Sequence, residues 1–179
     1  DNAKTTLDAA VATFQASVIT SVSTNTLIAD CEDGNQTKLL TFWYSYNDAA
    51  PGGSSIVTPL STQTSPFTMS LGGANGTDSA AKITYTLMGA AQLGYDPFVG
   101  FGFALKNPEA AYDLSGSTGI SFYHKGDAVA LEVGLSTNTD SDFYTAQISS
   151  HANWTLVTIP WTSFAQSPYW GNDVPWDAS

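Results

Sequence analysis

Residues 140–170 decide the fold and read DSDFYTAQISSHANWTLVTIPWTSFAQSPYW. Residues 143–148 alternate with period 2, a short polar connection follows at 149–153, and a second run at 154–159 ends at Pro160. Alternation around a short polar connection is typical of a β-hairpin, and proline ends a strand ladder because it has no N–H to donate. We therefore predict that these two runs pair as a hairpin.

Period-2 runs recur along the rest of the chain and are separated by turn-forming residues. We predict further strands at residues 26–31, 39–46, 65–71, 81–87, 98–105, 119–123 and 128–135. No amphipathic helical segment separates them, which disfavours a βαβ architecture. The pattern predicts an all-β fold, an antiparallel two-sheet β-sandwich of the jelly-roll type. We assign it to residues 26–179, with residues 1–25 as an N-terminal extension or covering segment.

Two of the predicted strands have distinct faces. The strand at 39–46 places Tyr44 and Tyr46 on the face opposite to Trp43. The strand at 98–105 alternates phenylalanines with Gly100 and Gly102. Glycines within a strand often mark a place where another group approaches the backbone closely. Most aromatic side chains inside strands are expected in the core. We expect this of Phe42, Phe101, Phe103, Phe122, Trp154 and Trp161.

The composition indicates a single globular domain with an acidic but weakly charged surface. The 179 residues suffice to bury a core, and they carry a formal net charge of −11 with no arginine. Charged residues make up only 12% of the chain, about half the usual share. Such a chain repels phosphate backbones and anionic lipids, so we expect neither nucleic acid nor membrane as a partner. We expect a secreted or cell-surface protein whose ligand is neutral or cationic.

Several short motifs occur in a recognisable order. They are D-x-E-x-G at Asp30, Glu32 and Gly34, W-x-S-Y at 43–46, G-Y at 94–95, G-I-S-F at 119–122 and N-W-T-L-V-T-I-P-W-T-S-F at 153–164. In this order they resemble the carbohydrate-binding modules of family 11 and the related family 30, which accompany cellulases and mixed-linkage β-glucanases. The resemblance covers roughly residues 27–169 and implies a jelly roll whose concave groove holds one β-1,4- or mixed β-1,3-1,4-glucan chain.

The resemblance assigns the sugar-binding residues position by position. Tyr46 and Tyr95 match groove tyrosines of the W-x-S-Y and G-Y motifs, and Asp140 matches a sugar-bonding aspartate. Tyr169 or Trp170 matches a further tyrosine after the S-F pair. Independently of any family, a neutral polysaccharide offers apolar ring faces surrounded by hydroxyls, which aromatic rings and carboxylates can bind. The alternative for each tyrosine is a core position.

The chain departs from the family pattern in two ways. The arginine after S-F has no counterpart, because Gln166 and Ser167 stand there. The family also continues for two strands beyond the position of Ser179. We therefore expect a sandwich lacking its last strands, either as a fragment or completed by residues 1–25 or another chain.

A calcium site is a second expectation. Asp30 and Glu32 stand at positions i and i+2 of one predicted strand end, and carboxylate oxygens are the ligands that Ca²⁺ prefers. The resemblance implies a structural calcium there, with Ser79 contributing from the turn at 75–79. The alternative is that two acids near a turn are simply solvated.

Catalytic motifs are absent from the sequence. Neither G-x-S-x-G nor H-E-x-x-H occurs, and Cys31, His124 and His151 suggest no triad. No E-x-D-x-E run is present, although two carboxylates could still meet across strands at the roughly 5–9.5 Å of glycoside hydrolysis. We expect a module that is not an enzyme and that targets an attached glycoside hydrolase to β-glucan. A small jelly-roll glycoside hydrolase and a structural or adhesion module are the alternatives.

Overall fold

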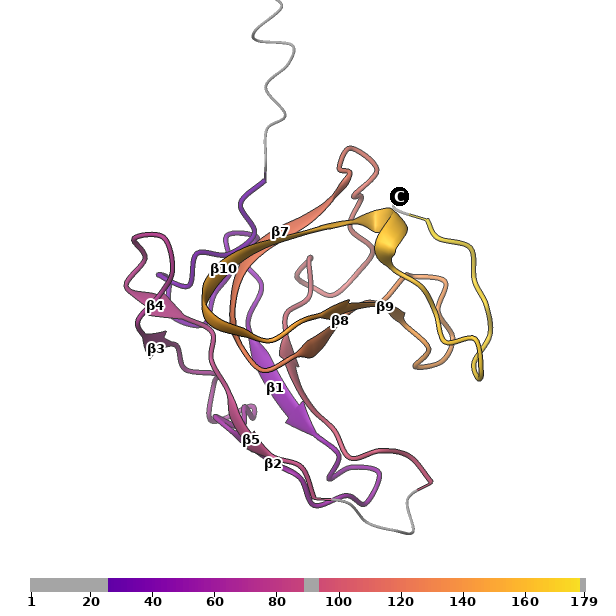
Figure 1. The fold of residues 1–179 in the computed structure, drawn as a ribbon, viewed down its shortest axis with the longest axis horizontal. Coiled ribbons are helices and arrows are strands. Elements are labelled where there is room, and N and C mark those ends of the chain that lie inside the picture. Colours follow the sequence, from indigo (N-terminus) through magenta and orange to yellow (C-terminus); the bar gives the residue numbers. More distant parts are fainter. Residues whose placement is uncertain (1–25, 89–93, 178–179) are drawn as a thin grey trace, which may run out of the picture.

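The computed structural model describes residues 26–88 and 94–177, so the predicted N-terminal segment 1–25 lies outside the described residues. As predicted, the fold is all-β and sandwich-like, and every strand pair is antiparallel (Figure 1). The elements are β1 (Tyr44–Asn47), β2 (Ile56–Thr58), β3 (Ser70–Leu71), β4 (Ser79–Ala80), β5 (Thr84–Thr86), β6 (Val99–Gly102), β7 (Gly119–Gly126), β8 (Val129–Val133), β9 (Tyr144–Ile148), β10 (His151–Pro160) and the 3-10 helix η1 (Trp161–Ser163).

A long two-stranded ribbon forms the second half of the fold. Strand β7 pairs with β10, and β8 pairs with β9. Gly126 lies opposite His151 and Val129 lies opposite Ile148, so one register continues from the first pair into the second. Between the pairs the ribbon curls over on itself (Figure 1). Gly126 has a φ of 133°, a conformation that glycine adopts readily, and it lies at this bend.

The predicted hairpin between residues 143–148 and 154–159 is wrong. Both runs are strands, but β9 pairs with β8 and β10 pairs with β7. The polar connection is a bend in the ribbon rather than a hairpin turn. Local alternation identifies a strand but not its partner, which is set by how the two layers bury their inner faces. The prediction for Pro160 is confirmed, because β10 ends there.

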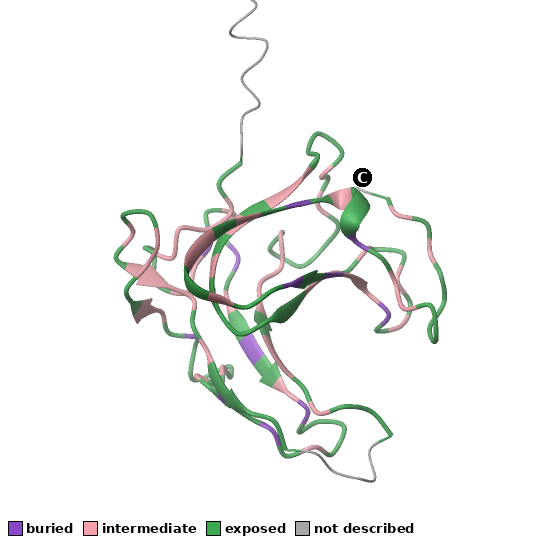
Figure 2. Ribbon diagram, in the orientation of Figure 1, coloured by how far each residue is buried: buried purple, intermediate pink, exposed green. Residues whose placement is uncertain are grey.

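The inner faces of the folded ribbon form one core. Ala146 and Ile148 of β9, Ile159 of β10 and Phe164 are buried together. Ile120, Phe122, Leu131, Val133, Tyr144, Val157, Trp161 and Trp176 pack around them. Figure 2 shows buried positions on β9 and β10. Two facing pleated layers thus remove apolar side chains from water, which favours folding by about 25 cal/mol per Å² buried.

A second aromatic cluster lies under the β1–β6 pair. Trp43 stacks on Phe101 with ring centroids 5.8 Å apart and meets Phe103 edge-on at 4.6 Å. Phe67 also stacks on Phe101 and is only 2% exposed. The predicted faces of both strands are therefore confirmed, because Trp43 and the phenylalanines share the packed side. The core expectation fails for Phe42, which is 49% exposed, and holds only in part for Phe101, which stacks in the cluster but is 38% exposed.

Several predicted strands are shorter than expected, and one is missing. Residues 26–31 form no strand, and the left-handed φ of 66° at Cys31 ends the extended chain there. The Ile28 carbonyl instead accepts a hydrogen bond from the Lys38 amide of a nearby loop. Only residues 70–71 and 84–86 pair within the predicted runs at 65–71 and 81–87. Strand β2 was not predicted.

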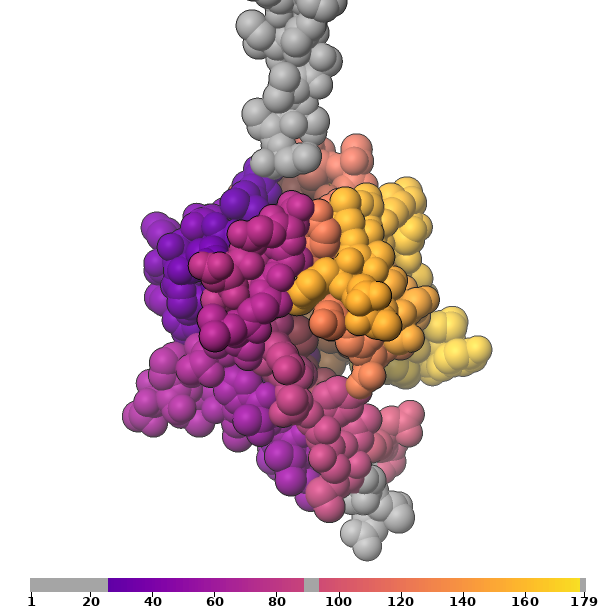
Figure 3. Space-filling model, turned by 60° about the vertical axis from the view of Figure 1, so that its left-hand side comes forward, coloured from indigo at the N-terminus to yellow at the C-terminus, as the bar shows by residue number. Residues whose placement is uncertain are grey.

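The two halves of the chain lie side by side, the first half indigo to magenta and the second orange to yellow (Figure 3). The indole N–H of Trp154 on β10 donates to the Gly72 carbonyl beside β3, at 3.1 Å, and links them. No helix among the described residues is long and apolar enough to cross a membrane.

Candidate functional site

Four aromatic rings form a continuous row on the open face of β1 and the segment before β6. Tyr44 lies 6.1 Å from Tyr46, Tyr46 lies 6.3 Å from Phe98, and Phe98 lies 5.9 Å from Tyr95, between ring centroids. We call this row the aromatic strip. Its four members are 38–47% exposed, so each offers part of a ring to solvent. A row of half-exposed rings suits a ligand with repeated apolar faces.

The strip depends on a glycine in the neighbouring strand. Tyr46 pairs with Gly100 and Tyr44 with Gly102, on the same face of the sheet. A Cβ at Gly100 would overlap the ring and hydroxyl of Tyr46, whereas one at Gly102 would only touch the Tyr44 hydroxyl at 3.9 Å. The Tyr46 ring therefore lies across the β6 backbone. This confirms the sequence expectation of a close approach for Gly100 but not for Gly102.

Buried Asp48, at the end of β1, fixes the far end of the strip. Its carboxylate accepts hydrogen bonds from the amide and the hydroxyl of Ser55, at 2.9 and 2.8 Å. It also accepts one from the amide of Phe98, at 3.4 Å. Burial would raise the pKa of Asp48, but the hydrogen bonds from Ser55 and Phe98 outweigh it and hold the pKa below 3.8. An ionised Asp48 thus holds Phe98 beside β1.

Two glutamates accompany the strip. Burial raises the pKa of Tyr44, and the negative charges of Glu109 and Glu132 raise it further. Burial and the charge of Glu132 act in the same way on the pKa of Tyr46. Desolvation also raises the pKa of Glu132 itself, which lies on β8. The charges of both carboxylates are therefore felt at the Tyr44 end of the strip. Sequence reasoning missed Glu132, because β8 is remote from β1 in the chain.

The five predicted binding residues fall in two places. Tyr46 and Tyr95 belong to the strip, joined through Phe98, a residue that the sequence had not singled out. Tyr169 and Trp170 instead belong to the C-terminal segment after η1, and Asp140, in the loop between β8 and β9, is hydrogen-bonded to Asn172 of that segment. Tyr169 is 92% exposed and Trp170 56%. Within the part of the chain that the structure describes, no ring contact joins these two to the strip.

Asp140 holds the C-terminal segment in place. Its Oδ2 accepts the backbone and side-chain N–H groups of Asn172, at 3.0 and 2.9 Å, and its Oδ1 accepts the Asp142 amide at 3.0 Å. The hydrogen bond from Asp142 and those from Asn172 lower the pKa of Asp140. With both oxygens engaged, Asp140 orders the segment that carries Tyr169 and Trp170. Its predicted contact with sugar stays a prediction.

The predicted calcium ligands lie together and have protein partners. Glu32 accepts the Ser79 amide at 2.9 Å, and Asp30 accepts the Glu32 amide at 3.2 Å. The Lys38 ammonium lies 2.9 Å from Asp30 and 2.6 Å from Asp33. Among the described residues no three His, Cys, Asp or Glu side chains group as a metal site. A calcium ion would have to displace Lys38, so this ligand set fits calcium poorly without rearrangement.

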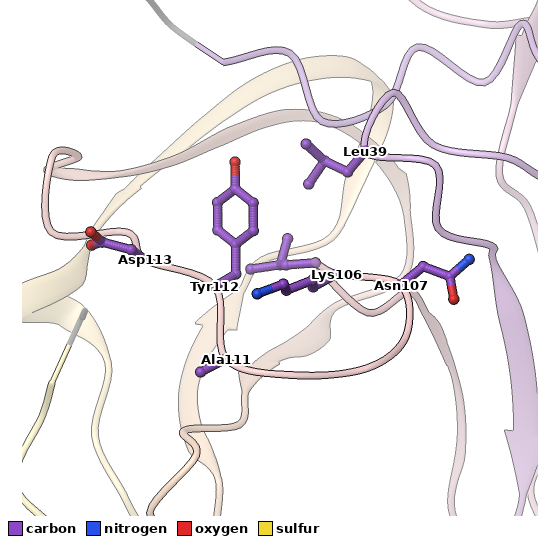
Figure 4. Close-up of a pocket in the computed structure, with 7 residues that line it drawn as sticks. Leu39, Lys106, Asn107, Ala111, Tyr112 and Asp113 are labelled. Atoms are coloured by element: carbon purple, nitrogen blue, oxygen red, sulfur yellow. The ribbon is translucent and has the colours of Figure 1, made fainter.

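A small hollow of about 290 Å³ lies on the loop after β6. Leu39, Lys106, Asn107, Ala111, Tyr112 and Asp113 line it with Leu105 (Figure 4). Its volume is at the lower end of ligand pockets, and none of the predicted site residues lines it. The same loop carries Glu109, whose charge raises the pKa of Tyr44.

The fold and the strip define an all-β sandwich with an exposed aromatic face, and comparison with known proteins gives its family. The model of the family Complex I intermediate-associated protein 30 (CIA30) matches residues 33–177. This chain belongs to that family. The expected membership of carbohydrate-binding module family 11 or 30 is therefore wrong.

One curated relative is an enzyme. The chain is 31% identical over 155 residues to Endoglucanase 3 of Fibrobacter succinogenes, a match that covers 86% of this chain. It covers 22% of that protein, so the chain spans about a fifth of the relative's length. No solved structure matches the chain. The relationship to an endoglucanase connects the chain with a glucan-related protein.

Proposed function

We propose that this chain is a non-catalytic module that binds a single β-1,4- or mixed β-1,3-1,4-glucan chain along the aromatic strip. The observation that carries the proposal is the unbroken row from Tyr44 through Tyr46 and Phe98 to Tyr95. Glucose rings in such polymers repeat along one direction and expose apolar faces. A row of rings at about 6 Å steps can contact successive sugars, which a single aromatic side chain cannot.

The charge around the strip supports a neutral, hydroxyl-rich ligand. Glu109 and Glu132 supply acceptors near Tyr44, and the chain as a whole carries a net charge of −11. Carboxylates accept hydrogen bonds from sugar hydroxyls, whereas they repel anionic polymers. We expect a dissociation constant on the order of 10–100 μM, because exposed stacking repays only part of the cost of ordering a chain.

The similarity to Endoglucanase 3 supports a role as a module attached to an enzyme. Endoglucanase 3 matches this chain over about a fifth of its own length, which leaves most of that protein for other parts. In our proposal the module is secreted or lies at the cell surface and tethers an attached glycoside hydrolase to its polymer. Tethering raises the local substrate concentration without any new contact at the catalytic centre.

Affinity electrophoresis in native gels tests the proposal. The gels would contain barley β-glucan, hydroxyethyl cellulose, xylan or no polysaccharide, and the protein should be retarded by the first two. Tyr46→Ala should migrate freely. Tyr123→Ala is the matched control, because Tyr123 on β7 has the same 39% exposure as Tyr46 but lies outside the strip. Equal retardation of both variants would mean that the aromatic strip does not bind the polysaccharide.

A glycoside hydrolase acting on the same polymers is the second candidate. It is favoured by the two carboxylates whose charges act on Tyr44, because desolvation raises the pKa of Glu132 and Glu109 is a second acidic group. Release of reducing sugar from barley β-glucan by the wild type, and its loss in Glu132→Gln, would establish this function and overturn the binding-only proposal.

The family description favours a third candidate. Complex I intermediate-associated protein 30 is named for association with a protein assembly, and exposed aromatic rings also suit a protein partner. This candidate predicts no retardation by any polysaccharide.

A further inference from the structure

The two histidines of this chain meet at the bend of the ribbon. They are the only histidines among its 179 residues and stand 27 positions apart. Their Nδ1 atoms lie 2.9 Å apart and their rings are nearly perpendicular, at 79°. His124 belongs to β7 and His151 begins β10. Nothing in the proposed glucan site uses them.

A bulge brings the two side chains together. The register between β7 and β10 shifts between His151 and Thr155, so His124 faces Thr155 while His151 faces Gly126. Bulges commonly re-aim a side chain and are found next to functional sites. Here the irregularity turns two residues on opposite strands toward one point. Both are partly buried, so their rings are held by the surrounding ribbon.

We propose that His124 and His151 form a two-histidine site for a borderline divalent cation such as Cu²⁺, Ni²⁺ or Zn²⁺. Metal–nitrogen bonds are about 2.0–2.1 Å long, so two ligands at right angles lie about 2.9 Å apart. The Nδ1 atoms have this separation because one donates a hydrogen bond to the other, so a bound ion would replace the proton between them. Imidazole nitrogens at right angles suit tetragonal Cu²⁺ and Ni²⁺ in particular, with water completing the coordination. Each ring must turn so that both lone pairs point at the ion.

The ligand type also selects the kind of metal. A neutral imidazole has a lone pair for a metal, whereas an imidazolium does not. The acidic chain also attracts cations in general. Hard cations such as Mg²⁺ and Ca²⁺ prefer oxygen and are not expected here.

A bound ion would cross-link the two strands of the ribbon at its bend. It would join β7 and β10 next to Gly126, where the chain turns from one layer to the other. A ligand that binds only the folded state raises its stability by mass action. We therefore expect the melting temperature of the full chain to rise with added Cu²⁺ or Ni²⁺ but not with Mg²⁺.

Copper titration of the untagged full chain tests the site. Isothermal titration with Cu²⁺ in glycine buffer, which suppresses weak binding to carboxylates, should show one ion per chain. His124→Gln and His151→Gln should each weaken binding at least tenfold, because even partners outside the ligand shell are typically worth about 10–100-fold. Asp173→Asn is the control for loss of a negative charge elsewhere and should bind as the wild type does.

Electron paramagnetic resonance of the wild type with one equivalent of Cu²⁺ keeps the test independent of the variants' folding. Splitting by two imidazole nitrogens is the expected result, and thermal melts without metal establish whether each variant folds. Copper bound without this splitting, or bound equally well by folded histidine variants, would overturn the site.

Discussion

The ring of Tyr46 lies directly over Gly100 of the neighbouring strand, where any side-chain carbon would overlap it. Gly102 holds the equivalent position opposite Tyr44 but leaves room, with a Cβ at 3.9 Å from the Tyr44 hydroxyl. Substituting each of these two glycines therefore distinguishes the effect of moving the Tyr46 ring from the general effect of adding a side chain to β6.

Gly100→Ala should displace the Tyr46 ring and weaken glucan binding. Overpacking of this kind typically costs about 1–3 kcal/mol of stability as well. Gly102→Ala should bind glucan as the wild type does, because its Cβ makes an ordinary contact. Isothermal titration with a soluble β-glucan oligosaccharide, together with thermal melts, measures both effects. Equal binding by the two variants would mean that the position of Tyr46 does not matter.

Tyr46→Ala and Tyr95→Ala should each weaken glucan binding by about 1–3 kcal/mol, the range in which aromatic contacts dominate a binding surface. Both rings are more than a third exposed, so the loss of stability should be small. Tyr169→Ala is informative in the same calorimetric series. Normal binding by this variant would restrict the site to the strip, whereas a comparable loss would extend it to the C-terminal segment.

Glu132→Gln should stabilise the protein at pH 7. Glu132 stays exposed on β8, but partial desolvation raises its pKa in the folded state above the ordinary 4.5, so the effect should be small. A carboxyl of this kind favours folding below pH 4.5, and that contribution is lost as the pH rises through the raised pKa. The variant should therefore melt above the wild type at neutral pH, and the difference should vanish below about pH 4.5. Parallel melts between pH 3.5 and 7.5 would check this, and a pH-independent difference would contradict it.

Asp48→Asn should lower the melting temperature at pH 7. An amide has one acceptor oxygen, and its NH₂ group would face donors from Ser55 or Phe98. Because the pKa of Asp48 lies below 3.8 in the folded state, its stabilising effect is present above that pH and lost as the pH falls further. Thermal melts should therefore show the largest difference between variant and wild type near neutrality. Ser115→Ala, in an exposed turn, is a control for a minor change.

Chelation tests the calcium prediction. If Asp30 and Glu32 hold a calcium ion, EDTA should lower the melting temperature and added Ca²⁺ should restore it. Lys38→Met should then bind Ca²⁺ more tightly, because the ammonium no longer competes for Asp30. An unchanged melting temperature with EDTA, for both proteins, would rule the ion out.

The sequence by itself determined the fold class, the position of most strands and the two faces of the strand that carries Tyr44 and Tyr46. These follow from period-2 alternation, which reflects the geometry of each strand alone. It also marked Tyr46 and Tyr95 as candidates, and Gly100 as a place of close approach.

Only the tertiary structure decided which strands pair and which distant residues meet. The runs around Pro160 look like a hairpin, yet β9 and β10 bury their apolar faces from opposite layers and take different partners. Phe98 completes the strip because buried Asp48 binds its amide. His124 and His151 come into contact through a bulge. Pairing, loop closure and burial depend on contacts far apart in the chain, which local periodicity does not encode.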